Sequence, residues 1–458
     1  MTDWWDVARV TIDRLPDVAL LEIFDFYTVG GYIEGWQALV HVCRKWRNVV
    51  FGSPRRLGLQ LFCKARTPVR ETLDVWPPLP IVISAIDDEG LGDDNMINII
   101  AALEHNDRIS SIDVTGVPNS HSEQVLEAMG QPFPALKLLQ LAYEDKTLPV
   151  LPASFLGGSA PSLERLWLLR IPFPGLPKLL LSATHLVFLQ LWNIPHSGYI
   201  PPEVMVACLS VLTRLESFRI GFESPQSRPD RRFPPPQTRT PLPILHTLQF
   251  RGVSEYLEDL VARISVPLLN ELEITFFHQL MLDTPQLNQF IIRTPKFNGH
   301  DRAYVQFSNR VVSVKLLPKS VGEDGLELAM LCGQPDWQLS SLAQLCSSSF
   351  PQALIPAVEH LHIIDEARSQ LHWQDDIESS QWLELLQPFT GVKDFYISRE
   401  LIPRIAPVLQ ELGVTEVLLP ALRTVFLQDE HLSGSTIEHF VAARLLAGHP
   451  VSVSQWRW

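Results

Sequence analysis

The sequence predicts an α/β fold: a short all-helical module followed by a solenoid with a parallel sheet on its concave side. Three observations lead to this prediction. Residues 12–51 hold two amphipathic helical stretches, and from residue 109 onward the pattern apolar-x-x-apolar-x-apolar recurs. Hydrophobic residues make up 46% of the 458-residue chain, which is enough for a large core and more than one domain.

The first helical stretch begins at a proline. Pro16 suits the first turn of a helix, where no amide donor is needed. A Gly-Gly pair at residues 30–31 ends the stretch. Between them, apolar residues recur at helical spacing and form one stripe: Leu20, Ile23, Phe24 and Tyr27.

The second stretch, residues 36–50, has an apolar face and a basic back. The basic side chains are Arg44, Lys45 and Arg47. Two helices this short cannot form a domain alone, so we expect the apolar side to bind a partner. The apolar face consists of Trp36, Leu39, Val40, Cys43, Trp46 and Val50.

The order of these residues resembles the F-box. The motif reads Leu-Pro at 15–16 and Ile-Phe at 23–24, closed by Val-Cys-Arg-x-Trp-Arg at 42–47. F-boxes bind a Skp-type adaptor, which links them to a cullin-based ubiquitin ligase. One departure is the middle, where TVGGYIEG replaces a second Leu-Pro-like turn with an acidic residue. The alternative is a pair of ordinary core helices. The resemblance implies these adaptor-binding residues: Leu15, Pro16, Leu20, Ile23, Phe24, Val42, Cys43 and Trp46.

Composition narrows the class of partner and the compartment. A net charge of −14 and a pI near 5.5 argue against nucleic acid and anionic membranes as partners. The five cysteines form no Cys-x-x-Cys pair, so neither a disulfide framework nor a zinc site is expected. The start, MTDWWDVARV, lacks the basic and apolar regions of an export signal. We therefore expect a protein of the cytoplasm or nucleus.

The repeated pattern can be read twelve times. Up to residue 311 its units begin 18 to 30 residues apart, which brackets the leucine-rich-repeat period. Such units stack their strands into a parallel sheet, and their apolar residues fill a continuous core. The units are Ile109-Ile112-Val114, Leu136-Leu139-Leu141, Leu163-Leu166-Leu168, Leu186-Leu189-Leu191, Leu215-Phe218-Ile220, Leu245-Leu248-Phe250, Leu269-Leu272-Ile274, Leu287-Phe290-Ile292, Val311-Val314-Leu316, Val358-Leu361-Ile363, Val392-Phe395-Ile397 and Leu422-Val425-Leu427.

The units resemble leucine-rich repeats of irregular length. They depart from that family because apolar residues such as Ile171 and Ile194 replace the asparagine that usually follows the strand. Together with the F-box, the whole chain resembles the expanded F-box proteins of mushroom-forming fungi. The resemblance implies an F-box at 10–52, a linker and N-terminal cap of the solenoid at 53–108, and an irregular repeat solenoid at 109–458 that ends in a C-terminal cap.

Prolines interrupt the repeats between residues 223 and 241. A solvated Pro-rich loop is the simplest interpretation, and a dedicated peptide ligand is the alternative. Near the end of the chain, residues 377–389 and 436–450 each have the pattern of a helix that leads into a strand. We expect the second of these helices to cap the open edge of the solenoid.

Residues between the repeat leucines should project from the concave surface, because neighbours in a strand point to opposite faces. Aromatic residues and arginines there are the side chains that dominate protein interfaces. The alternative is that the aromatics are buried beneath a loop. The candidate substrate-binding residues are Arg165, Trp167, Phe188, Gln190, Trp192, Arg219 and Arg251.

Catalytic motifs are missing from the sequence: it has no Gly-x-Ser-x-Gly elbow, no His-Glu-x-x-His helix and no Walker loop. His360 and His362 form the most metal-like pair, but no third ligand is identifiable, and two exposed histidines on the sheet are the simpler interpretation. We expect neither a catalytic residue nor a cofactor or metal. The expected function is recognition of a protein substrate for a cullin-type (SCF) ubiquitin ligase, and a ligase-independent repeat scaffold capped by the N-terminal helices is the alternative.

Overall fold

The computed structural model places the chain in two compact units, residues 1–166 and 167–458. The domain boundaries predicted above follow the sequence motifs and stay predictions. The structure describes residues 14–29, 35–64, 69–85, 93–115, 119–142, 150–225, 238–279, 282–319, 325–333, 335–366, 379–412, 418–428 and 435–456.

The first unit begins with a helical head of three helices, α1 (Asp17–Val29), α2 (Gly35–Val42) and α3 (Arg44–Gly52). Two helices were predicted, and the second is divided at Cys43. That residue has extended backbone angles, and its Sγ accepts a hydrogen bond from the Trp46 amide at 3.5 Å, so it acts as the N-cap of α3. Cys43 therefore lies between the end of α2 at Val42 and the start of α3 at Arg44.

After the head, the first unit alternates strands and helices. Its strands pair in parallel in chain order, and Ile112 of one strand lies opposite Leu139 of the next, as the repeat pattern predicts. The pairing already begins at Leu61, within the segment predicted as linker and cap. The elements are β1 (Leu61–Lys64), α4 (Val69–Val75), β2 (Ile81–Ala85), α5 (Asp93–Leu103), β3 (Ile109–Thr115), α6 (Asn119–Ala128) and β4 (Leu138–Ala142).

The division between the units falls within β5 (Arg165–Leu169). The second unit continues the alternation, and β6, β7, β9 and β11 pair in parallel and in repeat register, so that Leu189 lies opposite Phe218. A proline in the first turn begins α7 and α8. The elements are α7 (Leu176–Ser182), β6 (Phe188–Ile194), α8 (Pro202–Leu209), β7 (Ser217–Phe222), β8 (Thr240–Pro241), β9 (Thr247–Gly252), α9 (Ser254–Arg263), β10 (Ile264–Ser265) and β11 (Glu271–Phe277).

The parallel order is interrupted after β11. The next strands are β12 (His300–Phe307), β13 (Val311–Pro318) and β14 (Leu326–Leu331), followed along the chain by β15 (His360–Asp365). Their order in the sheet is β11-β14-β13-β12-β15. β14 pairs in parallel with β11 and β12 pairs in parallel with β15, whereas β13 is antiparallel to both of its neighbours. The parallel sheet that was predicted therefore contains one antiparallel meander.

Two predicted repeat units fall in this region, and both need correction. Leu287-Phe290-Ile292 lies in a helix, α10 (Pro285–Ile292), because Leu287, Phe290 and Ile291 are buried at helical spacing while Ile292 is exposed. Val311-Val314-Leu316 is a strand, but it runs antiparallel to its neighbours.

Beyond the meander the parallel alternation resumes to the end of the sheet. The helix predicted to cap the solenoid is α14 (Ser435–Leu446), and it precedes β18 (Ser452–Gln455). The last strand at this end of the sheet is therefore β18. The elements are α11 (Pro335–Ser348), β15 (His360–Asp365), α12 (Ser379–Leu386), β16 (Asp394–Ile397), α13 (Ile402–Leu412), β17 (Thr424–Leu427), α14 (Ser435–Leu446) and β18 (Ser452–Gln455).

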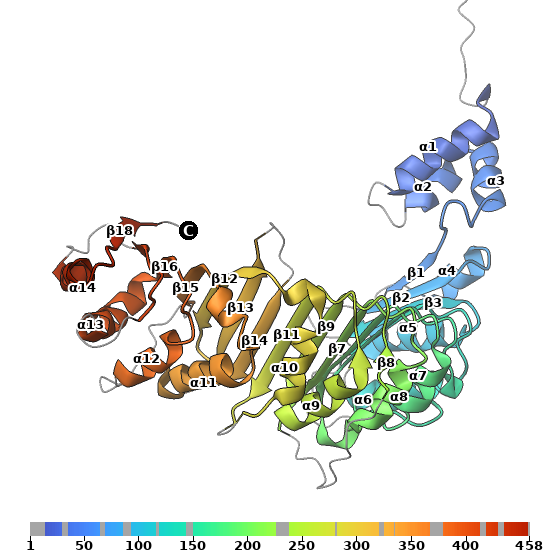
Figure 1. The fold of residues 1–458 in the computed structure, drawn as a ribbon. Coiled ribbons are helices and arrows are strands. Elements are labelled where there is room, and N and C mark those ends of the chain that lie inside the picture. Colours follow the sequence, from blue (N-terminus) through green and yellow to red (C-terminus); the bar gives the residue numbers. More distant parts are fainter. Residues whose placement is uncertain are drawn as a thin grey trace, which may run out of the picture. The chain divides into compact units, whose positions relative to one another are not determined.

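In the second unit the helices line one face of the sheet and leave the other uncovered (Figure 1). The repeat leucines point toward the helices, and residues such as Leu189, Phe218 and Leu248 are fully buried. The side chains between them lie on the uncovered side, which we call the open face. Within the described part of the chain, no helix is both long and apolar enough to cross a membrane.

Candidate interaction surfaces

The helical head has a small core of its own. Phe24 is fully buried, and its ring lies 4.8 Å from the Trp46 ring, measured between centroids. Lys45 ties α3 to the start of α1, because its Nζ donates to the Leu15 carbonyl at 2.7 Å. Arg47 donates from Nε to the Val40 carbonyl at 3.0 Å. The three helices thus hold one another together.

The predicted adaptor-binding residues differ in exposure, and their role stays a prediction. Leu20 and Phe24 are fully buried in the head. Ile23 and Val42 are exposed, with 49% and 57% of their surface accessible. Pro16 is also exposed, and the remaining three predicted residues are half-buried: Leu15, Cys43 and Trp46.

Exposed apolar residues gather on α1 and the end of α2. Phe26 is 85% exposed and Val18 is 65% exposed, and Tyr27 is 45% exposed. With Ile23 and Val42 they make up what we call the head patch. The indole Nε1 of Trp46 is buried and has no acceptor among the described residues.

The other large aromatic residue of the head is held by the segment after it. Trp36 is 1% exposed and lies edge-on to Trp76, with ring centroids 5.1 Å apart. Its Nε1 donates to the Gln60 carbonyl at 3.1 Å. Arg56 forms an ion pair with Glu22 of α1. These contacts join the head to the polypeptide that leads into β1.

The open face of the second unit carries six of the seven predicted substrate-binding residues, and all six are half-buried: Trp167, Phe188, Gln190, Trp192, Arg219 and Arg251. The seventh, Arg165, is exposed and belongs to the first unit, so its predicted position beside Phe188 stays a prediction. The aromatics lie on the face where the repeat register places them.

Arginine guanidinium groups lie over aromatic rings on β6 to β11. Arg219 lies over Phe188, with its Cζ 5.5 Å from the ring centroid, and Arg251 lies over Phe277 at 5.7 Å. Arg251 also donates to Asn193 at 3.4 Å, and desolvation by burial lowers the pKa of its guanidinium. We call this part of the open face the arginine zone. It consists of Trp167, Phe188, Trp192, Ser217, Arg219 and Arg251.

Trp192 lies across the backbone of β7. A Cβ on Gly221 would come within 2.9 Å of the Trp192 indole, so the absence of a side chain there makes room for the ring. Asn193 follows with φ of 52°, and Arg170 has φ of 60° at the equivalent point after β5. The Arg170 amide donates to the Trp192 carbonyl at 2.9 Å, which sets the ends of β5 and β6 side by side.

Acidic residues occupy the next strands. Glu273 of β11 lies in register with Glu327 of β14, and Gln249 donates to Glu273 at 2.8 Å. Burial raises the pKa of Glu273, and so do the charges of Glu327 and Glu271, while Arg219 and Lys315 act in the opposite direction. The negative charges of these carboxylates therefore repel one another, and the positive charges of Arg219 and Lys315 offset that repulsion only in part.

A row of stacked rings crosses β12 to β17. Tyr304 and His362 stack with centroids 4.4 Å apart, and Tyr396 and Phe426 stack at the same distance. Trp456 stands edge-on to His362 at 5.9 Å. Sequence reasoning missed this ring ladder. The signal was present, because His362, Tyr396 and Phe426 occupy the same position in three successive repeat units.

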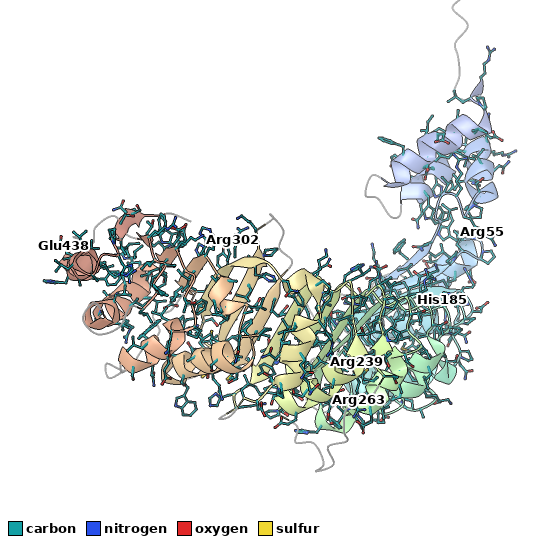
Figure 2. All side chains as sticks on the ribbon, viewed as in Figure 1. Arg55, His185, Arg239, Arg263, Arg302 and Glu438 are labelled. Atoms are coloured by element: carbon teal, nitrogen blue, oxygen red, sulfur yellow. The ribbon has the colours of Figure 1, made fainter. Side chains whose placement is uncertain are left out.

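The histidine pair divides into two environments. His360 makes an ion pair with Asp394, Nδ1 to Oδ2, at 3.1 Å, and Arg302 of β12 lies in register with it (Arg302 is labelled in Figure 2). His362 lies within the ladder, where burial, followed by the charges of His360 and Arg302, lowers its pKa to about 4. Among the described residues, no group of three or more His, Cys, Asp or Glu side chains is arranged to hold a metal ion.

Comparison with known proteins gives little beyond this geometry. No protein-family model matches the chain. No curated protein matches it. Among solved structures, the chain is similar to the leucine-rich repeat-containing protein LegL7 from Legionella pneumophila, with a TM-score of 0.30 and 11% sequence identity over 85% of this chain and 98% of that one. The pairing of the strands in the sheet is what shows a parallel-dominated repeat fold.

Proposed function

We propose that this protein is the substrate-recognition subunit of a cullin-type (SCF) ubiquitin ligase. In this proposal the head patch binds a Skp-type adaptor, and the open face of the sheet binds the protein to be modified. The chain itself performs no chemistry. It raises the concentration of its target near the subunits that transfer ubiquitin, in the cytoplasm or nucleus.

The observation that carries the proposal is the head patch. Five apolar side chains, from 45% to 85% exposed, lie on a head whose own core is already filled by Leu20 and Phe24. Apolar residues gathered on a small surface are typical of a binding site for another protein. Two of them, Ile23 and Val42, are also positions of the F-box pattern. The buried Trp46 Nε1 of α3 would be satisfied by a carbonyl of the partner.

Co-purification with a Skp-type adaptor tests the proposal. The triple variant Ile23→Ala, Phe26→Ala and Val42→Ala removes three of the five exposed apolar side chains and leaves the core of the head unchanged. A matched control, Leu181→Ala, Leu268→Ala and Ile292→Ala, removes three apolar side chains of the second unit that are 51%, 44% and 57% exposed. We expect the adaptor to co-purify with the wild type and the control but not with the patch variant. Equal recovery with all three proteins would refute the proposal.

A specific observation supports a second candidate, the ligase-independent scaffold. Trp36 of the head packs on Trp76, and Glu22 pairs with Arg56, so the head is tied to the chain that follows it, as a cap would be. The two candidates differ in one respect. A cap uses Trp36 and needs no free apolar patch, whereas an adaptor-binding module needs Ile23, Phe26 and Val42 exposed. Failure of the folded wild-type protein to bind an adaptor would favour the scaffold.

A further inference from the structure

We propose that the arginine zone binds a carboxylate on an extended acidic segment of the target protein, held by Arg219 and Arg251. This inference rests on the proposed function for the identity of the open face as the target-binding surface, and it adds the chemistry of what is bound.

Four buried polar atoms of the arginine zone have no hydrogen-bond partner among the described residues: Trp167 Nε1, Ser217 Oγ, Arg219 Nε and Arg251 Nε. Each of them can donate a hydrogen bond, and three cannot accept one. Buried donors without acceptors are costly and rare in folded proteins. The donors of Ser217, Arg219 and Arg251 lie on the adjacent strands β7 and β9, and that of Trp167 lies on β5, two strands from β7, so together they indicate an acceptor supplied by a ligand.

The spacing of these donors suits one small anion. Arg219 lies opposite Gln249, and Arg251 lies opposite Gly221, so the two arginines sit on neighbouring strands one pleat apart. Two residues along a strand and one strand across correspond to about 8 Å between Cα atoms. Trp167 of β5, Gln190 of β6 and Arg219 of β7 occupy the same position in successive repeat units. The long arginine side chains can therefore converge on one carboxylate from two sides.

Each guanidinium group lies over an aromatic ring of a neighbouring strand. Phe188 lies under Arg219 and Phe277 lies under Arg251. Stacking on a ring leaves the edge of the guanidinium, with its N–H donors, free to bind oxygen atoms. Burial destabilises the Arg251 cation and lowers its pKa, and a bound anion would offset that cost. Guanidinium and carboxylate are matched in shape for paired hydrogen bonds.

The charge balance favours a monoanion. Arg219 acts on Glu273, whose pKa its charge lowers, so one of the two arginine charges is already opposed by a carboxylate on β11. Arg219, Arg251 and Glu273 together carry one net positive charge, and Glu271 on the same strand as Glu273 reduces it further, so a dianion is disfavoured more than a monoanion. Glu271 lies beside Thr247 and accepts its hydroxyl at 3.0 Å, which would add repulsion toward a dianion. An aspartate or glutamate side chain fits this balance better than a phosphate.

Apolar surface lies beside the donors. The indole of Trp192 rests over Gly221, next to Arg251 in the strand register, and it remains partly exposed. A residue flanking the carboxylate in the target can pack on this ring. The predicted ligand is therefore an extended segment in which an acidic residue adjoins an aromatic or aliphatic one.

The test uses three synthetic peptides and the complete protein. The probe peptide is acetyl-Gly-Phe-Glu-Ser-Gly-amide, and its partners carry glutamine or phosphoserine in place of the glutamate. The readout is the Trp167 indole N–H signal in a two-dimensional NMR spectrum, assigned with Trp167→Phe. We expect the glutamate peptide to shift this signal saturably and to bind about tenfold or more tightly than the glutamine peptide.

Variants locate the site. Arg219→Gln and Arg251→Gln should each lower the affinity for the glutamate peptide about tenfold. Arg214 is an exposed arginine in the turn before β7, and Arg214→Gln should leave the affinity unchanged. Circular dichroism establishes that each variant is folded. Equal binding of the glutamate and glutamine peptides, or no shift up to about 5 mM peptide, would overturn the proposal. Tighter binding of the phosphoserine peptide than of the glutamate peptide would overturn the proposal that the ligand is a monoanion.

The result is separable from the proposed function, because peptide binding needs neither adaptor nor cullin. A protein that binds the glutamate peptide but no adaptor would retain the carboxylate site and lose the ligase assignment. A protein that binds the adaptor but not the peptide would retain the ligase assignment and lose the carboxylate site.

Discussion

His362 and Tyr396 stack face to face on the open face of the sheet, with ring centroids 4.1 Å apart and planes 8° from parallel. The two residues are register partners on neighbouring parallel strands, so the spacing of the strands sets the spacing of the rings. The imidazole has Tyr304 on its other side, with centroids 4.4 Å apart. This arrangement leaves little water around His362, and it determines how the residue titrates.

The first prediction concerns stability at acidic pH. The pKa of His362 is about 4 in the folded protein, against an ordinary value of 6.5, chiefly because burial disfavours the cation. The unfolded chain therefore binds a proton between pH 6.5 and 4 that the folded chain does not, and stability falls as the pH falls through this window. A full shift of this size corresponds to on the order of 3 kcal/mol.

His362→Phe keeps a ring in the ladder and removes the titration. We expect the difference in unfolding free energy between variant and wild type to be constant above about pH 7 and to move in favour of the variant as the pH approaches 4. Chemical denaturation across this range measures it, and NMR titration of the His362 ring gives the midpoint directly. A midpoint near 6.5 would contradict the buried stack.

The second prediction separates the core of the head from its surface. Phe24 is fully buried against Trp46, whereas Phe26, two residues away on the same helix, is 85% exposed. Phe24→Ala should destabilise the head by about 3–5 kcal/mol, because it leaves a cavity. Phe26→Ala should change stability by no more than about 0.5 kcal/mol. Hydrogen exchange of the α1 amides compares the two variants, and equal effects would contradict the assignment of faces.

The third prediction concerns the space beneath Trp192. Gly221→Ala places a Cβ between 2.9 and 3.1 Å from three atoms of the Trp192 ring, so the indole must move. We expect a loss of about 1–3 kcal/mol in stability. Gly333→Ala is the matched control, because a Cβ there meets no atom within 4 Å. Thermal unfolding measures both, and an unchanged Gly221→Ala protein would show that Trp192 does not rest on β7.

A fourth prediction concerns the approach to β16. A Cβ on Gly391 would lie 2.1 Å from the Pro356 carbonyl oxygen and 3.2 Å from that of Val358, both of them backbone atoms that cannot rotate away. Gly391→Ala should therefore destabilise the second unit more than Gly221→Ala does, since a side chain can yield where a backbone cannot. The same thermal unfolding measurement ranks the variants, and the reverse order would contradict this packing.

The repeat pattern predicted most strands of the sheet because burial imposes it. A strand with one face against helices must place apolar residues at alternate positions, and units such as Leu245-Leu248-Phe250 do so. The pattern failed at residues 287–292, where the same spacing of apolar letters also fits a helix. Pro285, in the first turn of α10, was the signal that could have decided between them.

The direction of the strands could not be read from apolar spacing. The pattern of Val311-Val314-Leu316 is the same whether a strand runs parallel or antiparallel. Only three residues, 308–310, separate β12 from β13, and so short a connection can join antiparallel strands but not parallel ones. The alternation of Ala303, Val305 and Phe307 before that turn would have revealed the hairpin.

The candidate surfaces were predictable to different degrees. The arginine zone followed from the register, because the residues between repeat leucines must face outward. The head was harder, since two short helices show which residues are apolar but not which of them meet each other. Phe24 and Ile23 are adjacent in the sequence, yet one is fully buried and the other is 49% exposed. That distinction depends on the packing of α3 against α1.

The most direct test of adaptor binding is a calorimetric titration of the folded protein, residues 1–458, with a purified Skp-type adaptor. The proposed function predicts saturable one-to-one binding that is weakened at least tenfold by the variant Ile23→Ala, Phe26→Ala and Val42→Ala and is unaffected by Leu181→Ala, Leu268→Ala and Ile292→Ala. Absence of binding by the folded wild-type protein, or equal binding by both variants, would contradict it.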